Sequence, residues 1–422
     1  MTKPRLTRYQ TILVAVAALV TLFMLAYGQV GGPDTHTYIN AWPTIASGHL
    51  DKMRTPVYPL FIGLFEAISK VHRDFLLILF QNIVACIALY YAYKIIIRLT
   101  KSAKAAFWTV LVMAVLPAFI VYRNIIMTES FAISGSIFLI YCTLGIYDGR
   151  SRWNLLGFAF WLLFLIFLRP SFIYMLPVFA VAMGLIIWKK PALRKRAGIA
   201  LLSIVAVTVA LLGYMQAFYN EYGVFSTTSI GTENDVFIMR QSGDLDPSKT
   251  NDKALADYIT KIYNEHGTGL YTNEYLGIVG KEAAHIYEDW DLVTVHNLVK
   301  ASKTWKNQLK GVAIRTYYAG SSEFLYPRMS SPFAMFNATI GWIYLLLILY
   351  SIWIVAVWRA TRHLPWESFL LLMLGGSNVI VAVVGAYGQA EGEWGRLISP
   401  SLFIYFIMFA QLSLVCLKKI RK

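Results

Sequence analysis

The chain has 422 residues, of which 57% are hydrophobic and only 14% are charged, and its formal net charge is +15. Soluble domains carry about 25% charged residues, so the composition excludes an ordinary soluble protein and predicts a polytopic membrane protein. The excess of Lys and Arg over Asp and Glu is explained by membrane topology and requires no nucleic-acid partner.

Ten apolar runs approach or reach the roughly 17–25 residues that a helix needs to cross a bilayer. The first run is too long for a signal peptide and lacks a small-residue cleavage site, so it predicts an uncleaved anchor. In chain order the predicted spans are 10–29, 75–97, 104–122, 126–147, 153–168, 171–188, 197–216, 336–358, 366–387 and 398–417.

The distribution of lysine and arginine predicts the orientation. If all ten runs cross the membrane, six segments fall on one side, and these hold half of the 38 Lys and Arg residues. The positive-inside rule places that side, and with it both termini, in the cytoplasm. The six segments are the N-terminus, 98–104, 150–152, 189–196, 359–362 and 418–422.

The first large outer segment is 30–74, and two short helices are expected in it. Residues 35–48 have an amphipathic pattern, whose apolar stripe is Tyr38, Ile39, Trp42 and Ile45. Thr55 and Pro56 then have the character of an N-cap and a first helical residue. The helix that they open is short for a span, so we expect it in or near the membrane interface.

The second large outer segment, 217–335, is polar and too long for a simple connector, so it predicts a small, mostly helical domain or a lid. Helical stretches are expected at 249–267 and 303–320. The predicted organisation is an N-terminal membrane module (1–216), this outer domain, and C-terminal membrane helices (336–422). The predicted fold class is therefore an all-α polytopic membrane protein with about ten transmembrane helices.

Acidic side chains are nearly absent from the spans and stand at their outer ends. Asp34 follows the first span, where it can cap the helix expected from Thr35 or act as a base at the membrane surface. Glu129, in the motif MTES, can cap the fourth span, because acids favour helix N-termini, or act as a second acid. Both alternatives stay open for each residue.

Three arginines at the outer ends of the spans run against the positive-inside trend: Arg54, Arg169 and Arg396. Guanidinium groups gathered at one membrane face suit a phosphate at headgroup depth. Each arginine also has a structural alternative. Arg54 can snorkel or pair with Asp51, Arg169 can donate to carbonyls left unpaired at the Pro170 break, and Arg396 can pair with a glutamate of its own motif, EGEWGR.

Other sites are not indicated by the sequence. The three cysteines all lie in predicted spans, so no disulfide framework is expected. The seven histidines do not cluster, and no metal-ligand spacing or nucleotide-binding motif is present. We expect neither a metal nor a cofactor.

Several motifs, taken in order, resemble those of a known family. One span followed by P-D-x-x-x-Y, a short helix ending in G-H-L, and then R-T-P-V-Y-P-L-F is similar to the start of GT-C type membrane glycosyltransferases. These include bacterial relatives of protein mannosyltransferases and of the lipid A aminoarabinose transferase. The later motifs 127-MTES-130, 168-LRPS-171 and 395-GRLISP-400 are similar to further landmarks of the family. The resemblance covers most of the chain, but not 217–335.

The resemblance implies a fold of many membrane helices whose first outer loop forms the active site, and a polyprenyl-phosphate sugar as donor. It implies that Asp34 is the base. Some relatives have a second acid directly after the first, whereas this chain has Thr35 there and Glu129 is the nearest substitute. It further implies that no metal is needed with a monophosphate donor. Tyr58, in R-T-P-V-Y-P, is a candidate substrate-binding residue or an interfacial aromatic.

The resulting hypothesis is a glycosyltransferase of the bacterial inner membrane. It would transfer a sugar, with inversion, from undecaprenyl phosphate to a cell-surface glycan, lipid or protein on the periplasmic side. Its candidate residues are catalytic Asp34 and Glu129, and substrate-binding Arg54, Tyr58, Arg169 and Arg396. Two alternatives stay open: a flippase for a lipid-linked glycan, and an O-antigen polymerase or ligase with a pyrophosphate-linked donor.

Overall fold

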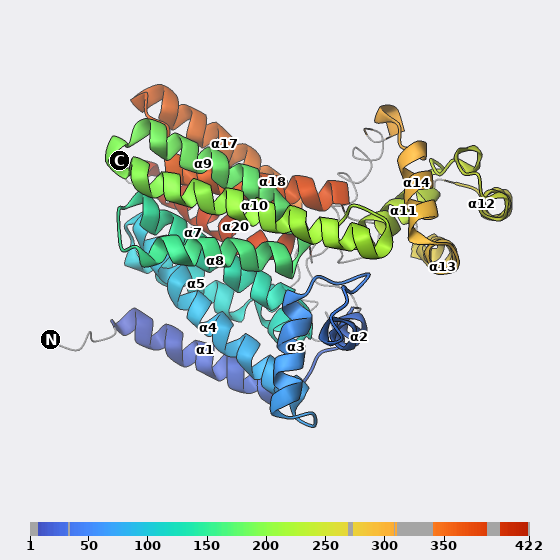
Figure 1. Cartoon of the computed structure of the whole chain (residues 1–422). Coiled ribbons are helices and arrows are strands. Elements are labelled where there is room, and N and C mark those ends of the chain that lie inside the picture. The colour runs from blue at the N-terminus through green and yellow to red at the C-terminus, as the bar shows by residue number, and fades with distance from the viewer. Residues whose placement is uncertain are drawn as a thin grey trace.

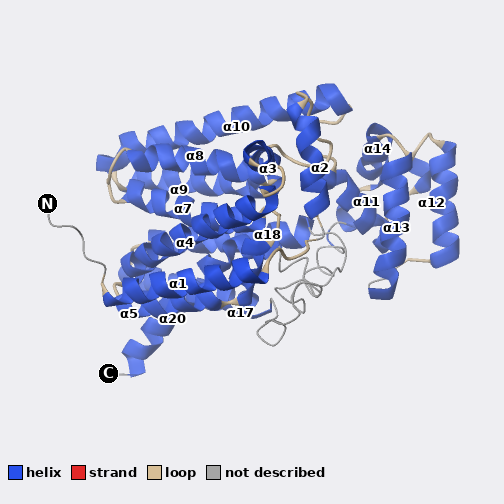
Figure 2. Ribbon diagram, turned by 90° about the horizontal axis from the view of Figure 1, so that it is seen from below, coloured by secondary structure: helices blue, strands red, loops and turns tan. Residues whose placement is uncertain are grey.

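The regular elements of this computed structural model are helices, as Figure 2 shows. The structure describes residues 7–32, 34–268, 273–307, 309, 341–385 and 397–420, and these contain no strand. The predicted all-α class is therefore confirmed for the described part of the chain.

Eight of the described helices are long and apolar enough to cross a membrane, which supports a multi-pass membrane protein. Their backbone groups are satisfied within each helix, as the interior of a bilayer requires. The eight are α1 (Arg8–Tyr27), α4 (Arg73–Thr100), α7 (Glu129–Tyr147), α9 (Met175–Lys189) with the 3₁₀ turn before it, α10 (Arg194–Tyr222), α17 (Gly341–Thr361), α18 (Trp366–Gly385) and α20 (Leu402–Ile420).

One predicted span is split in the structure, and another, predicted at 153–168, has the predicted bounds but is short for a crossing. The span expected at 104–122 is split into α5 (Ala103–Val115) and α6 (Pro117–Ile120), because a proline has no N–H and its ring collides with the preceding turn. Helix α8 (Trp153–Leu168) has 16 residues and ends just before Pro170. The count of ten crossings therefore stays a prediction.

Helix α7 lies inside the bundle and is buried on all sides over nearly its whole length. It packs closely against α8: a Cβ on Gly135 would lie 2.9 Å from Leu165, and one on Gly145 would lie 2.5 Å from Asn154. Small residues permit such close approach between membrane helices. Because the two helices are consecutive and pack side by side, the start of α7 and the end of α8 meet at one end of the bundle.

The helices of the first outer segment lie at the end of the bundle opposite both termini (Figure 1). They are α2 (Thr35–Ala46) and α3 (Val57–Ile68), and they confirm the two short helices expected there. The expected cap is wrong: Pro56 occupies the N-cap position of α3, and the Thr55 hydroxyl donates instead to the carbonyl of Leu168, at 3.3 Å. This bond ties the first outer segment to the end of α8.

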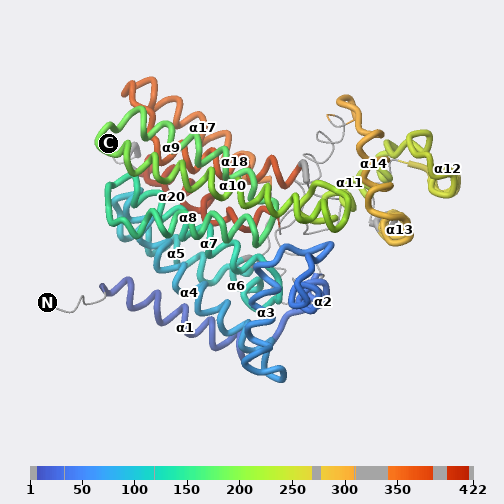
Figure 3. Tube along the Cα trace, viewed as in Figure 1, coloured from blue at the N-terminus to red at the C-terminus, as the bar shows by residue number. Residues whose placement is uncertain are grey.

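Four more helices project from the same end of the bundle (Figures 1 and 3). They are α11 (Ile230–Ser242), α12 (Lys253–His266), α13 (Asn273–Asp289) and α14 (Leu292–Ser302). Helix α12 confirms the helix expected at 249–267, whereas most of the one expected at 303–320 lies outside the described residues.

The outer helices have a hydrophobic core of their own, separate from that of the bundle. Arg240 is fully buried beside this core. Its Nε donates to Glu282 Oε2 at 2.7 Å, and its other nitrogens donate to the carbonyls of Gly267 and Ile262 at 2.8 and 3.1 Å. A buried charge needs such a complete set of partners, so the ion pair holds α11, α12 and α13 in one arrangement.

Helices α2 and α3 touch where Gly63 faces the ring of Trp42. A Cβ on Gly63 would lie 2.2 Å from that ring, so Gly63→Ala forces the two helices apart. We expect it to destabilise the protein by about 1–3 kcal/mol, as overpacking does, and to lower the melting temperature of the detergent-purified protein. The control is Gly213→Ala in α10, whose Cβ meets nothing within 4 Å. An equal effect of the two substitutions would contradict this packing.

Candidate functional site

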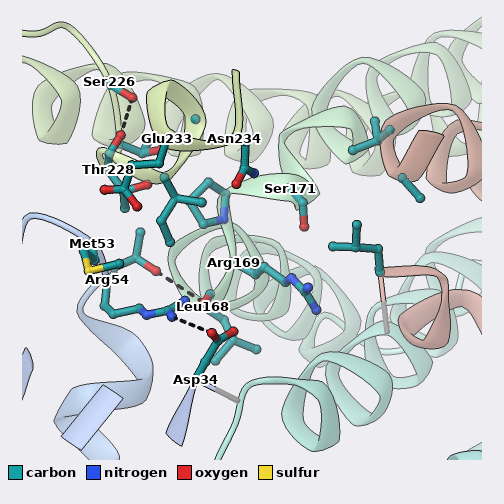
Figure 4. A pocket seen from close by; sticks show the side chains of 18 of the residues that line it. Asp34, Met53, Arg54, Leu168, Arg169, Ser171, Ser226, Thr228, Glu233 and Asn234 are labelled. Atoms are coloured by element: carbon teal, nitrogen blue, oxygen red, sulfur yellow. Dashed lines mark hydrogen bonds and ion pairs between the residues drawn. The ribbon is translucent and has the colours of Figure 1, made fainter. Parts of the chain in front are cut away.

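A cavity of about 500 Å³ lies at the end of the bundle that carries the outer helices. It is bordered by α2, the residues before α3, the start of α7, the end of α8, segment 226–238 and α18. Figure 4 shows its side chains from close by. Four of the residues singled out from the sequence line it: Asp34, Arg54, Glu129 and Arg169.

Asp34 occupies the N-cap position of α2, but its side chain makes no cap hydrogen bond. Its Oδ1 instead lies 3.2 Å from Nη2 of Arg54 (Figure 4). The carboxylate is 25% exposed, whereas the Arg54 side chain is 9% exposed. The acid is thus held in place by a buried cation and remains within reach from the cavity.

Arg54 is held by one face of α2. Its Nε donates to the Thr37 hydroxyl at 2.8 Å and its Nη1 to the Tyr38 hydroxyl at 3.4 Å. The guanidinium also lies over the Tyr38 ring, 4.3 Å from its centroid, where a cation–π attraction adds to the hydrogen bonds. Asp34, Thr37 and Tyr38 share a face because residues three and four apart are neighbours on a helix.

The charge of Arg54 acts on Asp51, but the hydrogen bonds of Asp51 go to nearby backbone. Oδ1 of Asp51 accepts the backbone N–H groups of Met53 and Arg54, at 2.9 and 2.6 Å. Burial raises the pKa of the Asp51 carboxyl, against the lowering effect of these two bonds and of the charge of Arg54. Asp51 therefore shapes the turn, and the turn directs the Arg54 side chain toward α2.

Glu129 and Arg169 form a second pair. Glu129 is the first residue of α7 and is 1% exposed, and its Oε1 lies 3.2 Å from Nη1 of Arg169. Arg169 directly follows α8 and precedes Pro170. Its side chain hydrogen-bonds to Glu129 rather than to carbonyls at the proline break. Glu129 also stands in the first turn of α7, where an acid is favourable, so both sequence interpretations of Glu129 fit its position.

Tyr58 does not line the cavity. It is fully buried behind Tyr38, with the ring centroids 5.0 Å apart. Its hydroxyl donates to Oε1 of Gln81 at 2.7 Å, which joins α3 to α4. Tyr58 thus supports the ring on which Arg54 rests. Arg396, the remaining candidate, lies outside the described residues.

The side of the cavity formed by segment 226–238 was not predicted from the sequence. Glu233, Asn234 and Asp235 line it, on the first turns of α11. Glu233 is 7% exposed, and its Oε1 accepts a hydrogen bond from the Ser229 hydroxyl. The only signal in the sequence was a run of three polar residues in a long polar segment, which does not distinguish a cavity wall from a solvated surface.

Among the described residues, no three His, Cys, Asp or Glu side chains gather into a group that could hold a metal ion. The polar groups that line the cavity are carboxylates, guanidinium groups, amides and hydroxyls. Two carboxylates are paired with arginines on one side, and two more, of Glu233 and Asp235, stand on α11.

Comparisons with known proteins show the fold. No protein-family model matches the chain, and no curated protein matches it. The structure is similar to that of the archaeal oligosaccharyltransferase AglB from Archaeoglobus fulgidus, in complex with an inhibitory peptide and a dolichol-phosphate, with a TM-score of 0.51 and 11% identity. The match covers 97% of this chain and 50% of the AglB chain, so this chain spans half of its length. At this identity the likeness shows a shared fold.

Burial raises the pKa of the Glu233 carboxyl above its ordinary value of 4.5, against the opposing effects of the Ser229 hydrogen bond and of Lys52 and Arg54. The folded protein thus binds this proton more tightly than the unfolded chain. The stability from this group is present below pH 4.5 and is lost as the pH rises through the raised pKa. We expect the uncharged Glu233→Gln to melt at a higher temperature than the wild type at neutral pH.

Thermal unfolding of the purified protein across a pH series measures this effect. The gain of Glu233→Gln is expected to shrink as the pH falls toward the ordinary range of a carboxyl group. Glu265→Gln, on an exposed residue of α12, is the matched control and is expected to show no such gain. A lower melting temperature of Glu233→Gln at neutral pH would contradict the burial cost assigned to Glu233.

Proposed function

We propose that this protein is a membrane glycosyltransferase that transfers a sugar from a polyprenyl phosphate, undecaprenyl phosphate in bacteria, to a hydroxyl group of a cell-surface glycan, lipid or protein. The observation that carries the proposal is the pairing of two arginines with two carboxylates around one cavity, at the end of the bundle opposite the termini. The fold likeness to an oligosaccharyltransferase solved with a dolichol-phosphate supports it.

Arg169 is the residue best suited to the donor phosphate. Among the described residues its side chain has one hydrogen-bond partner, Glu129, whereas a guanidinium carries five N–H donors. A phosphate oxygen can therefore use donors that the described residues leave open. As the bond to the sugar breaks, negative charge grows on the phosphate, and a preorganised guanidinium stabilises that charge. We assign Arg54 and Arg396 to the same phosphate.

Asp34 is the proposed base. The acceptor hydroxyl gives its proton to the Asp34 carboxylate while its oxygen forms a bond to the anomeric carbon of the donor sugar. The bond from that carbon to the phosphate oxygen breaks, and its electron pair leaves with the phosphate, which inverts the anomeric centre. Arg54 orients Asp34 for this step. The charge of a bound phosphate raises the proton affinity of the carboxylate beside it, so the base is strengthened when the donor is present.

The cavity is proposed to face the periplasm of a bacterial inner-membrane protein. The basic segments predict a cytoplasmic location for both termini. The termini lie at the same end of the bundle, and α2 and α11 lie at the other (Figure 1). A lipid-linked donor in the outer leaflet would carry its phosphate at the depth of the cavity.

Asp34→Asn tests the base directly. Because the Asp34 side chain makes no cap bond and asparagine can still accept from Arg54, we expect the variant to fold. We expect sugar transfer to fall by about 10²–10⁴-fold, the usual contribution of a general base. The measurement is sugar transfer from polyprenyl-phosphate donors by protein in nanodiscs, beside its melting temperature.

Asp74→Asn is the matched control, since Asp74 pairs with Arg73 and does not line the cavity. Near-normal transfer by Asp34→Asn would contradict its role as base. The same assay separates the alternatives when polyprenyl pyrophosphate donors are added. Turnover of the pyrophosphate alone favours a polymerase or ligase, and translocation of a lipid-linked glycan without turnover favours a flippase.

A further inference from the structure

Helix α11 brings polar side chains to the cavity on the side away from Asp34. Figure 4 shows Glu233 and Asn234 on one side and Asp34 on the other. Glu233 is nearly buried and is oriented by the hydroxyl of Ser229. The described residues place no cation within ion-pair distance of Glu233, whereas its neighbour Asp235 pairs with Lys303 at 2.6 Å.

This side of the cavity is hydrogen-bonded to the turn that carries Arg54. The backbone N–H of Ser229 donates to the carbonyl of Lys52 at 2.8 Å. The Tyr222 hydroxyl donates to the carbonyl of Leu50 at 2.5 Å, and the N–H of Leu50 donates to a Glu221 oxygen at 3.1 Å. The first bond joins the N-cap residue of α11 to the turn that carries Arg54, and the other two join the end of α10 to the same turn.

The charge of this side decides which part of a donor it can bind. A carboxylate without a cation partner repels a phosphate, so the α11 side is unsuited to the lipid phosphate. Carboxylate and amide oxygens accept hydrogen bonds from hydroxyl groups, and the amide also donates them. A sugar, whose polar groups are hydroxyls, matches this combination.

We propose that Glu233 and Asn234 form the subsite that binds the hydroxyl groups of the donor sugar, across the cavity from the arginines that bind its phosphate. This inference rests on the proposed function. The donor sugar fits better than the acceptor because it is covalently joined to the phosphate and must lie at a set distance from it. The hydrogen bonds that join the N-cap residue of α11 and the end of α10 to the Arg54 turn support such a distance. Glu233 is also nearly buried, which suits contact with a sugar that is enclosed in the cavity.

The test measures lipid binding to the wild type and to variants in nanodiscs. It compares bare undecaprenyl phosphate with undecaprenyl phosphate that carries glucose, mannose or arabinose. The double variant Glu233→Gln, Asn234→Ala is expected to bind bare undecaprenyl phosphate at least as tightly as the wild type, because it loses a carboxylate that repels the phosphate. For the sugar-bearing lipid that the wild type binds most tightly, the ratio of its affinity to that of the bare lipid is expected to fall by roughly ten-fold in the double variant. This is the effect of losing one or two hydrogen bonds. Arg169→Gln is expected to weaken binding of both lipids.

Glu265→Gln is the control for charge removal on the outer helices, and melting temperatures confirm folding of each variant. An unchanged sugar preference in the folded double variant overturns the subsite and leaves the proposed function standing. A wild type that binds none of these lipids overturns the proposed function and the subsite with it. Equal weakening of both lipids by the double variant also overturns the subsite, because α11 would then act on the phosphate.

Discussion

Arg54 is 8% exposed. A guanidinium stays protonated when it is buried, so its charge needs hydrogen-bond and ion-pair partners within the protein. Arg54 finds them on one face of α2, in Asp34, Thr37 and Tyr38. These contacts join the turn before α3 to the start of α2 and determine the position of the Asp34 carboxylate. The Tyr38 ring, supported from behind by Tyr58, completes the enclosure.

The same solution is used a second time in the cavity wall, where Glu129 and Arg169 pair at the junction of α7 and α8. Close packing of these helices brings the two residues together although 40 positions separate them. Each of these two ion pairs is neutral when no ligand is present. A phosphate anion entering the cavity would compete with the carboxylates for the arginines, which links donor binding to the state of the base in the proposed mechanism.

The sequence was sufficient to predict the helical class, because in a bilayer an apolar run satisfies its backbone only as a helix. The outer position of the candidate residues stays a prediction. It did not predict the partner of Arg54. The nearest acid in the sequence, Asp51, bonds to nearby backbone, as short acidic side chains in turns do, and the guanidinium pairs with Asp34 instead. Glu233 was missed because nothing local distinguishes a polar residue that faces a cavity from one that faces water.

The central claim is that this cavity binds a lipid phosphate beside Asp34. The most direct test is a cryo-electron microscopy structure of the protein in nanodiscs with undecaprenyl phosphate. The account predicts density for the phosphate within hydrogen-bond distance of the Arg169 guanidinium, in the cavity between Asp34 and α11. A lipid phosphate bound only elsewhere, for example at the basic end of the bundle near the termini, would contradict it.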